Sequence, residues 1–441
     1  MNSIGSRTKE LIGPNFFFMV WSGSIGIANS LVVWIAFTRT KDIVEVGNFA
    51  IMMGLYALFY GIVGLGLQPY LINEIRERGS QNDPVAKVTT FVSSAAAFLG
   101  ISGIAAACLM TATGYFLADS TEVFTAIAIL SISMVPSGID AVAESAAIAY
   151  EQTRIVAVIA TIENLLRTVV PLALILSGYG LIPIAIAFAI IRFTALIVYA
   201  ITARRHLANF DLRRAEVSKL ARITPTFAGT IVLANLNWQL PMIVLGFISV
   251  ASELAILGTS ARFLIPVSIL MGSFANAVHP TIVDQVKLGA SESVRCLSRL
   301  VALPLTFAMI AVGCSVLFGG SLLAALFGES YRAASQTLTV LAMCAAPFCV
   351  VMIAARALVA TSNQRIDLIA NVVGVVVCAT AAVTLTPEFG AVGAAVSQLL
   401  AFSVMAAIET IFLLRIFAPH SARAASAVGI LAFLRSAIWN K

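Results

Sequence analysis

The sequence has very little charge for its length. Only 11% of its 441 residues are Asp, Glu, Lys or Arg, whereas an average soluble domain has about 25%. Hydrophobic residues make up 60% of the chain, and the mean hydropathy is +0.99. This composition excludes an ordinary soluble enzyme and predicts an all-α polytopic membrane protein. The net charge of +6 lies mostly in the loops of one side, so we expect no nucleic acid as a partner.

Several catalytic signatures are also missing. None of the six lysines follows a glycine, which excludes the GKS or GKT phosphate loop of an ATPase. His206, His279 and His420 lie in separate regions and the six cysteines form no CxxC pair, so we expect no metal, no cofactor and no disulfide framework. The outward loops are too short to house a catalytic domain. We therefore expect a protein that is not an enzyme, with a membrane-embedded polysaccharide polymerase or glycosyltransferase as the less favoured alternative.

The sequence instead contains long apolar runs. About twenty apolar residues are needed to cross a bilayer as a helix. Twelve runs approach or exceed that length, at 16–37, 46–68, 89–111, 124–148, 155–177, 181–203, 226–248, 254–278, 297–318, 336–360, 366–386 and 391–414. The first run is too long for a signal-peptide core and has no small-residue cleavage site after it, so we expect the first helix to stay attached.

The lysines and arginines of the loops predict the orientation of these helices. The loops of one side hold 20 of them, whereas the other side holds Arg39, Lys41 and Arg332. The positive-inside rule therefore predicts a multi-pass protein of the cytoplasmic (inner) membrane with both termini in the cytoplasm. The predicted parts are an N-terminus (1–15), an N-lobe of six helices (16–203), a basic linker (204–222), a C-lobe of six helices (223–418) and a tail (419–441).

Two of these parts allow two interpretations each. The basic linker is either a surface helix held by anionic lipid headgroups or a segment that gathers an anionic substrate. The tail carries Val428, Leu431, Leu434 and Ile438 at helical spacing, so it is either an interfacial helix or a frayed end.

The two lobes read as an internal repeat. Landmark residues recur at a spacing of 211 or 210 residues, in the pairs Pro14 and Pro225, Pro69 and Pro280, Arg154 and Arg365, and Gly180 and Gly390. Because each unit has six spans, both copies point the same way across the membrane. Parallel repeats of this kind are a common transporter plan, with the substrate site between the repeats near the midplane.

Four arginines lie inside predicted spans. Arg167 shares the run 155–177 with Glu163, four residues away, so the two could form a private ion pair. Arg192 and Arg262 lie at a similar depth in other runs with no acid in helical register, so we expect both to lack close carboxylate partners. We therefore predict a belt of three guanidiniums, which suits a phosphate group. Arg356, four residues from the end of its span, either joins the belt or snorkels to the interface.

Other polar residues in the spans are candidate site residues. Asn235, Asn237 and Gln239 precede Pro241 and could hydrogen-bond either a sugar or a neighbouring helix. Asp140 and Glu144 are four residues apart and should not both be ionised without a partner. Together with Glu163 they are candidates for ion coupling, and the alternative for Asp140 and Glu144 is a salt bridge to an arginine of a neighbouring span.

The residues carry a resemblance to a known group of transporters. The segments VGNFAIMMGLYALFYGIVGLGLQPYLINEI, ELAILGTSARFLIPVSILMGSFANAVHPTIV, FGESYRAASQTLTVLA and QRIDLIANVVG resemble the polysaccharide transporter branch of the multidrug, oligosaccharidyl-lipid and polysaccharide flippase superfamily. The resemblance implies two six-helix lobes that form a V around a cationic cavity. It also implies a flippase that moves a polyprenyl-pyrophosphate-linked oligosaccharide outward for O-antigen, capsule or exopolysaccharide synthesis.

The same resemblance implies the partners and the main alternative. The partners would be the lipid-linked glycan, membrane lipids, and a polysaccharide polymerase with its assembly proteins. The drug and cation antiporter branch usually depends on acidic residues in its lobes, and the first run, 16–37, has none. A cation-coupled exporter of small molecules is therefore the second choice. Neither the glycan, the coupling ion nor the oligomeric state follows from the resemblance.

Overall fold

The protein is described by a computed structural model over residues 30–79, 84–207, 211–288 and 290–417. These residues form helices and no strand, which confirms the all-α class. Among them, nine helices are long and apolar enough to cross a membrane, or ten if one bent pair counts as a single span. The predicted count of twelve is not confirmed, because the first run lies mostly outside the described residues and the last two runs share one element.

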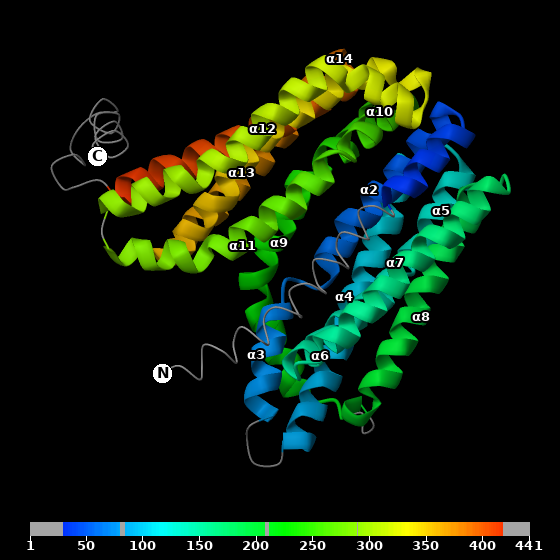
Figure 1. Ribbon diagram of the computed structural model, residues 1–441. Coiled ribbons are helices and arrows are strands. Elements are labelled where there is room, and N and C mark those ends of the chain that lie inside the picture. Colours follow the sequence, from blue (N-terminus) through cyan, green and yellow to red (C-terminus); the bar gives the residue numbers. More distant parts are fainter. Residues whose placement is uncertain (1–29, 80–83, 208–210, 289, 418–441) are drawn as a thin grey trace. The chain divides into compact units, whose positions relative to one another are not determined.

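The chain divides into two compact units, Met1–Asn235 and Leu236–Lys441, here called unit 1 and unit 2. Unit 1 begins with a helix at Ser30–Thr40. Its further elements (Figure 1) are α2 (Ile43–Val63), α3 (Gln68–Gly79), α4 (Pro84–Leu117), α5 (Thr121–Ser131), α6 (Met134–Ala149), α7 (Thr153–Leu176), α8 (Leu181–Leu207) and the first part of α9 (Arg214–Ile248).

Unit 2 contains the second part of α9 and the remaining helices. They are α10 (Ala251–Ala261), α11 (Leu264–Leu288), α12 (Ala290–Phe327), the 3-10 helix η1 (Glu329–Ala334), α13 (Ser335–Ala360) and α14 (Gln364–Phe417). Gly390 interrupts α14 with a φ of 53°, a conformation that glycine adopts without strain. The Ala391 N–H, which starts the second half of α14, donates to the Glu253 carboxylate at 2.7 Å.

The boundary between the two compact units lies inside α9, and the predicted division into lobes at the basic linker 204–222 stays a prediction. The described parts of that linker are the end of α8 and the first turns of α9. Helix α9 continues through Pro225 and Pro241. The predicted N-terminus 1–15 and tail 419–441 lie outside the described residues, so the orientation of both termini stays a prediction.

Three predicted runs prove to be two helices each, and the breaks have local causes. The run 46–68 breaks after α2, where Leu65 and Gly66 take φ values of 51° and 66°. The run 124–148 breaks between α5 and α6, where the Ser133 hydroxyl donates to the Leu130 carbonyl at 2.5 Å. Such a hydroxyl competes with the helical N–H for the carbonyl. The run 254–278 bends by 40° between α10 and α11.

An ion network fastens the start of α9 to α3 within unit 1. The Arg78 guanidinium donates to Glu216 and to Glu74, with N–O distances between 2.8 and 2.9 Å. It also lies 4.4 Å from the centre of the Phe91 ring. Lys219 donates to the same Glu74 carboxylate at 2.8 Å, and this hydrogen bond raises the pKa of the Lys219 ammonium. The start of α9 is therefore held to α3 by one arginine and one acid of α3, Arg78 and Glu74.

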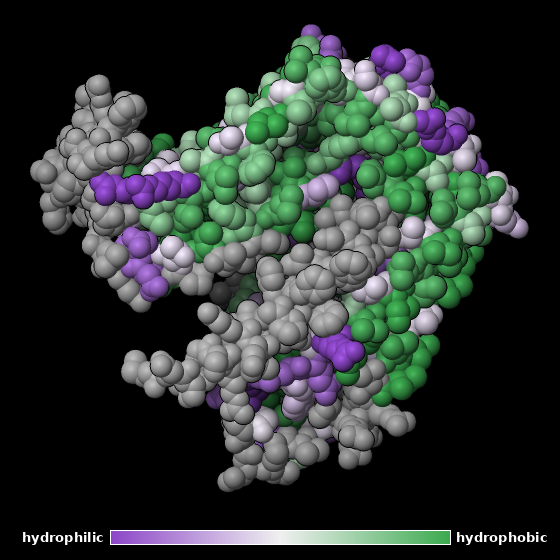
Figure 2. All heavy atoms as spheres, in the orientation of Figure 1, coloured by the Kyte–Doolittle hydropathy of each residue, from purple (hydrophilic) through white to green (hydrophobic). Residues whose placement is uncertain are grey.

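The outer faces of α7 and α8 are apolar. Val169, Ile190 and Ile197 are exposed by 57% or more. Figure 2 shows hydrophobic side chains along the outer side of these helices, in the orientation of Figure 1. Large apolar faces on a helix of this length are what a hydrocarbon environment allows.

Small residues let α4 and α6 approach closely, which positions the polar residues of α6. A Cβ atom on Gly138 of α6 would collide with the backbone carbonyl of Leu99 on α4. A Cβ on Gly103 of α4 would in turn meet the backbone of Met134 and Val135. Close backbone contact through small residues is the usual way in which membrane helices associate.

We expect Gly138→Ala to destabilise the protein by about 1–3 kcal/mol, the usual cost of overpacking a closed contact. The measurement is thermal unfolding of the purified protein in detergent. The matched control is Gly313→Ala in α12, where a Cβ would meet nothing within 4 Å. That control should be neutral or stabilising, because alanine favours a helix over glycine by about 1 kcal/mol. Equal melting temperatures for the two variants would contradict the close packing.

Candidate functional site

Charged residues of three helices meet polar side chains of a fourth in the interior of unit 1. We call this group the unit 1 charge cluster, and it consists of Tyr56 and Tyr60 of α2, Ser137 and Asp140 of α6, Glu163 and Arg167 of α7, and Arg192 of α8. Helices α7 and α8 run alongside each other in unit 1 (Figure 1). Asp140, Glu163 and Arg192 are 2%, 9% and 6% exposed, so the helices around the cluster bury these three side chains.

Glu163 lies at the centre of the cluster and forms ion pairs with two arginines. Its Oε1 atom is 2.9 Å from Arg167 Nη2 and 2.7 Å from Arg192 Nη1, and its Oε2 atom accepts from Arg192 Nη1 at 3.0 Å. The residue is only 9% exposed. The ion pair between Glu163 and Arg167 is therefore real, but it is not private.

Arg192 has carboxylate partners, so the expectation drawn from helical register is wrong for this residue. Besides Glu163, it lies 3.4 Å from Asp140 through its Nε atom, and the same Nε donates to Ser137 at 2.9 Å. Its Nη2 donates to the Tyr60 hydroxyl at 3.3 Å. The acids come from other helices, and spacing along one helix cannot reveal such partners.

Asp140 and Glu144 lie on the same helix but have different surroundings. Asp140 is 2% exposed, and neither of its oxygens accepts a hydrogen bond from the described residues. Its ion contact with Arg192 confirms the salt-bridge alternative for this acid. Glu144 instead accepts a hydrogen bond from Gln68 of α3 at 3.2 Å. Asp140 is thus a buried carboxylate with a charge partner but without a donor at hydrogen-bonding distance.

Arg167 faces aromatic side chains that the sequence reading did not select. Its Nη2 donates to the Tyr56 hydroxyl at 2.8 Å, and its guanidinium lies 5.7 and 5.8 Å from the ring centres of Tyr56 and Phe188. Arg192 likewise lies 5.1 Å from the centre of the Tyr60 ring. The sequence does contain one signal for the two tyrosines: Tyr56 and Tyr60 are four residues apart in one span, which places them on one helix face.

The charges of this region do not balance. Two arginines face the carboxylates of Asp140 and Glu163, and Glu144 adds a third carboxylate one helical turn beyond Asp140. An uncompensated charge in low dielectric is expensive, and a carboxylate in that situation can be neutralised by a proton. The arrangement can therefore bind a proton, and it can bind an anion when its carboxylates are neutral.

The other predicted arginines belong to unit 2. Arg262 lies at the bend between α10 and α11, and its approach to Arg167 and Arg192 stays a prediction. Arg356 lies on α13 with its Nε atom buried and without a hydrogen-bond partner in the described residues. Its positive charge acts on Asp367 of α14, so this guanidinium contributes to the interior of unit 2.

The polar residues of α9 contact neighbouring helices. Asn235 donates to its own helix at Ile231 O (2.9 Å) and to Gly61 O of α2 (3.5 Å), both within unit 1. Asn237 donates to the backbone carbonyl of Asn371 in α14 at 3.3 Å, within unit 2. The helix-contact alternative is thus confirmed for these two residues. Gln239 is half-buried on the same helix, and its predicted contact with a sugar stays a prediction.

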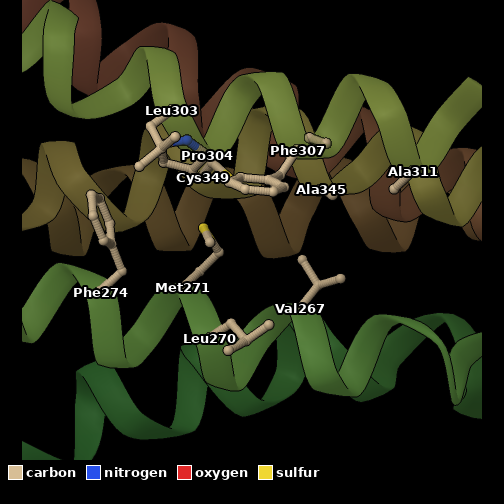
Figure 3. A pocket seen from close by; sticks show the side chains of 11 residues that line it. Val267, Leu270, Met271, Phe274, Leu303, Pro304, Phe307, Ala311, Ala345 and Cys349 are labelled. Atoms are coloured by element: carbon tan, nitrogen blue, oxygen red, sulfur yellow. The ribbon is translucent and has the colours of Figure 1, made fainter.

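Three cavities lined by described residues of unit 2 contain none of the predicted site residues. One of about 370 Å³ lies between α11, α12 and α13 (Figure 3). The side chains around it are those of Val267, Leu270, Met271, Phe274, Leu303, Pro304, Phe307, Ala308, Ala311, Ala345 and Cys349. These side chains carry no charge and no strong hydrogen-bonding group, so this cavity suits an apolar chain and not a phosphate or a sugar.

A double-mutant cycle on Glu163→Gln and Arg192→Gln should show that the cluster is coupled. Each single change leaves a buried charge with fewer partners and should cost about 3–5 kcal/mol. The double variant should lose clearly less stability than the sum of the two single losses, as measured by thermal unfolding in detergent.

The matched control for this cycle is the exposed pair Arg76 and Glu151, whose charged atoms are 2.7 Å apart. Its coupling should be only about 0.2–1 kcal/mol. Additivity of the Glu163 and Arg192 variants within about 0.5 kcal/mol would show that the two side chains act independently.

Known proteins share this fold. The chain is similar to the lipid II flippase MurJ in an inward closed conformation (TM-score 0.75, 14% identity, 96% of this chain and 90% of that chain). It is also similar to an inward-facing multidrug resistance MATE transporter (TM-score 0.70, 11% identity, 91% and 96%). A third is a transporter of the same superfamily from Pyrococcus furiosus, described as having a binding pocket of reverse polarity (TM-score 0.60, 14%, 95% and 97%). None of the curated proteins matches this chain.

These similarities at low identity show the fold, and the sequence itself shows the family. The pattern of the family described as polysaccharide biosynthesis protein matches residues 12–285, which is more than half of the chain. This stretch includes all of the unit 1 charge cluster. The chain therefore belongs to the polysaccharide biosynthesis protein family and has the fold of the flippase and multidrug transporter superfamily.

Proposed function

We propose that this protein is a flippase that carries a polyprenyl-pyrophosphate-linked oligosaccharide across the cytoplasmic membrane for the synthesis of a surface polysaccharide. The observation that carries the proposal is the pair of guanidiniums of the partly buried Arg167 and the buried Arg192, on adjacent membrane helices of a polysaccharide biosynthesis protein. The transport itself would proceed by alternating access and would be coupled to an ion.

The chemistry of the guanidinium supports a pyrophosphate as the group that is bound. Arginine stays protonated when it leaves water, and its planar fork can donate two hydrogen bonds to one anion. Arg167 is 19% exposed in its side chain and keeps its Nε atom without a hydrogen-bond partner in the described residues. It is therefore the better placed of the two arginines to meet an incoming anion.

The existing ion pairs link anion binding to proton binding. Because both arginines already contact Glu163, a pyrophosphate can recruit them only by replacing that carboxylate as a partner. The displaced carboxylate would then be buried without a cation unless it takes up a proton. Glu163, Asp140 and Glu144 are therefore the proposed coupling residues, and the linkage must be reciprocal between proton and anion.

Residues of unit 2 would complete the site. We propose that Arg262 and Arg356 add positive charge for the pyrophosphate, and that Gln239 of α9 offers its amide to the sugars. Both termini would lie in the cytoplasm, where the substrate is made. A polysaccharide polymerase and its assembly proteins would receive the product on the other side.

The main alternative is a cation-coupled exporter of drugs or other small molecules. It draws support from the shared fold with proteins described as multidrug resistance transporters. The family match favours the glycolipid. Arg167 and Arg192 also favour an anionic group over a cationic drug when the carboxylates around them are neutral.

Replacement of Arg167 tests the proposal in reconstituted vesicles. We expect Arg167→Ala to abolish translocation of a fluorescent polyprenyl-pyrophosphate oligosaccharide, because the charge and the fork are both lost. Arg167→Lys should retain measurable but reduced transport, because the charge remains without the fork. The readout is the fraction of labelled lipid that becomes accessible to an enzyme or quencher added outside.

The matched control is Arg332→Ala, which removes an exposed arginine whose partner Glu329 is exposed as well. It should transport at the parental rate, and the amount of folded protein should be compared for all variants. Parental transport by Arg167→Ala would refute the role of this arginine. Transport of an organic cation, with no transport of the lipid-linked glycan, would favour the drug exporter instead.

A further inference from the structure

A second group of ionisable side chains lies in unit 2 and was not selected from the sequence. Asp367 stands in the first turn of α14, and Glu409 stands in the second half of the same element, beyond the interruption at Gly390. The two carboxyl groups lie close enough for a hydrogen bond when one of them carries a proton. We call Asp367 and Glu409 the unit 2 carboxyl pair.

Glu409 is enclosed completely. Its exposure is 0%, and neither of its oxygens accepts a hydrogen bond from an N–H or O–H donor of the described residues. An ionised carboxylate in such a place would lose its hydration without any replacement, at a cost of several kcal/mol at least. A buried polar group without partners calls for an explanation, such as a bound ion or proton.

Asp367 is better provided with partners. It is half-buried, and its Oδ1 accepts a hydrogen bond from the Asn371 side chain at 3.0 Å. The charge of Arg356, on the adjacent helix α13, acts on it. Its place in the first turn of a helix also favours a negative charge, because the helix dipole is positive at that end.

The contact between the two carboxyls requires a hydrogen. Two ionised carboxylates have only acceptor atoms and cannot hydrogen-bond to each other, whereas a carboxylic acid can donate to a carboxylate. Because Asp367 has donors and a cation nearby and Glu409 has neither, the hydrogen belongs on Glu409. When Glu409 carries this proton it is neutral, and the negative charge of Asp367 is then balanced by the positive charge of Arg356.

We propose that Asp367 and Glu409 form a proton-binding site in unit 2, in which Glu409 holds the proton and donates it to the ionised Asp367. When Glu409 releases the proton, it passes through the half-exposed Asp367 to water. The ionised carboxylates of Asp367 and Glu409 then face the single guanidinium of Arg356. Their repulsion would separate the two halves of α14, which join at Gly390. Proton occupancy of this site would therefore control how tightly the halves pack.

This site is distinct from the unit 1 charge cluster. Glu409 follows Tyr199 by 210 residues, the spacing that also relates Gly180 to Gly390, so unit 1 has a tyrosine where unit 2 has this carboxyl. The hydrogen bond from Asn237 of α9 to Asn371 continues the polar chain to a third helix segment of unit 2. The proposal does not depend on what the protein transports.

Infrared spectroscopy of the purified full-length protein tests the proposal without any substrate. A protonated carboxyl has a carbonyl stretch that is separate from the bands of an ionised carboxylate. At neutral pH, the difference spectrum between the parental protein and Glu409→Gln should show one such band, which disappears in the variant. In Asp367→Asn the band should remain but shift to higher frequency, because an amide is a weaker acceptor than a carboxylate.

The matched control is Glu388→Gln, which changes an exposed acid of the same element and should leave the band in place. Glutamine resembles the protonated acid in shape and charge, so Glu409→Gln should keep the parental melting temperature. If Glu409→Gln does not fold, the frequency shift of the band in Asp367→Asn tests the proposal instead. The proposal would be overturned if the spectrum of the parental protein lacks this band. It would also be overturned if the band disappears from the parental spectrum when sodium replaces choline at constant pH.

Discussion

The interior of unit 1 depends on the requirement that a charge in an apolar environment must have a partner. A single charged side chain at the centre of a bilayer costs at least about 2.5–3.5 kcal/mol on insertion scales. Glu163 meets this requirement for two arginines at once, with contacts of 2.9 and 2.7 Å to Arg167 and Arg192. Helices α7 and α8 are thereby joined through one carboxylate, and Asp140 and Ser137 join α6 to the same point.

The same arrangement makes the cluster responsive to ligands. Buried ion pairs contribute less to stability than their distances suggest, because both partners lose hydration. With Glu144 included, this region has more carboxylates than cations and is balanced only when it holds a proton. Its arginines become available to an anion when the carboxylates are neutral. A stable fold and a site that exchanges protons and anions can therefore be made from the same side chains.

The sequence predicted the helices well and the polar contacts only in part. Apolar runs separated by charge, Gly or Pro placed the helices, because a span of this length leaves few other structures possible. The breaks at Gly66 and Ser133 were missed, because the apolar pattern continues across them. The same limit applies to the site, where Arg192 was expected to lack a carboxylate and has two.

The contacts that were missed share one physical reason. Sequence spacing relates residues on one helix face, as it did for Glu163 and Arg167, but it does not show which faces meet. The partnership of Glu163 with Arg192, the tyrosines of α2, and the contact of Asp367 with Glu409 all join segments distant in sequence. These contacts become visible only when close packing, such as that of Gly138 against α4, fixes how the helices are rotated.

The most direct test of the account is to count the protons that accompany anion binding. Calorimetric titration of the purified protein with a short-chain prenyl pyrophosphate, in buffers of different ionisation enthalpy, gives that number. The account predicts net proton uptake on binding by the parental protein, and reduced uptake in Glu163→Gln, where the displaced partner is already neutral. Binding of the pyrophosphate with no proton exchange in the parental protein would contradict the account.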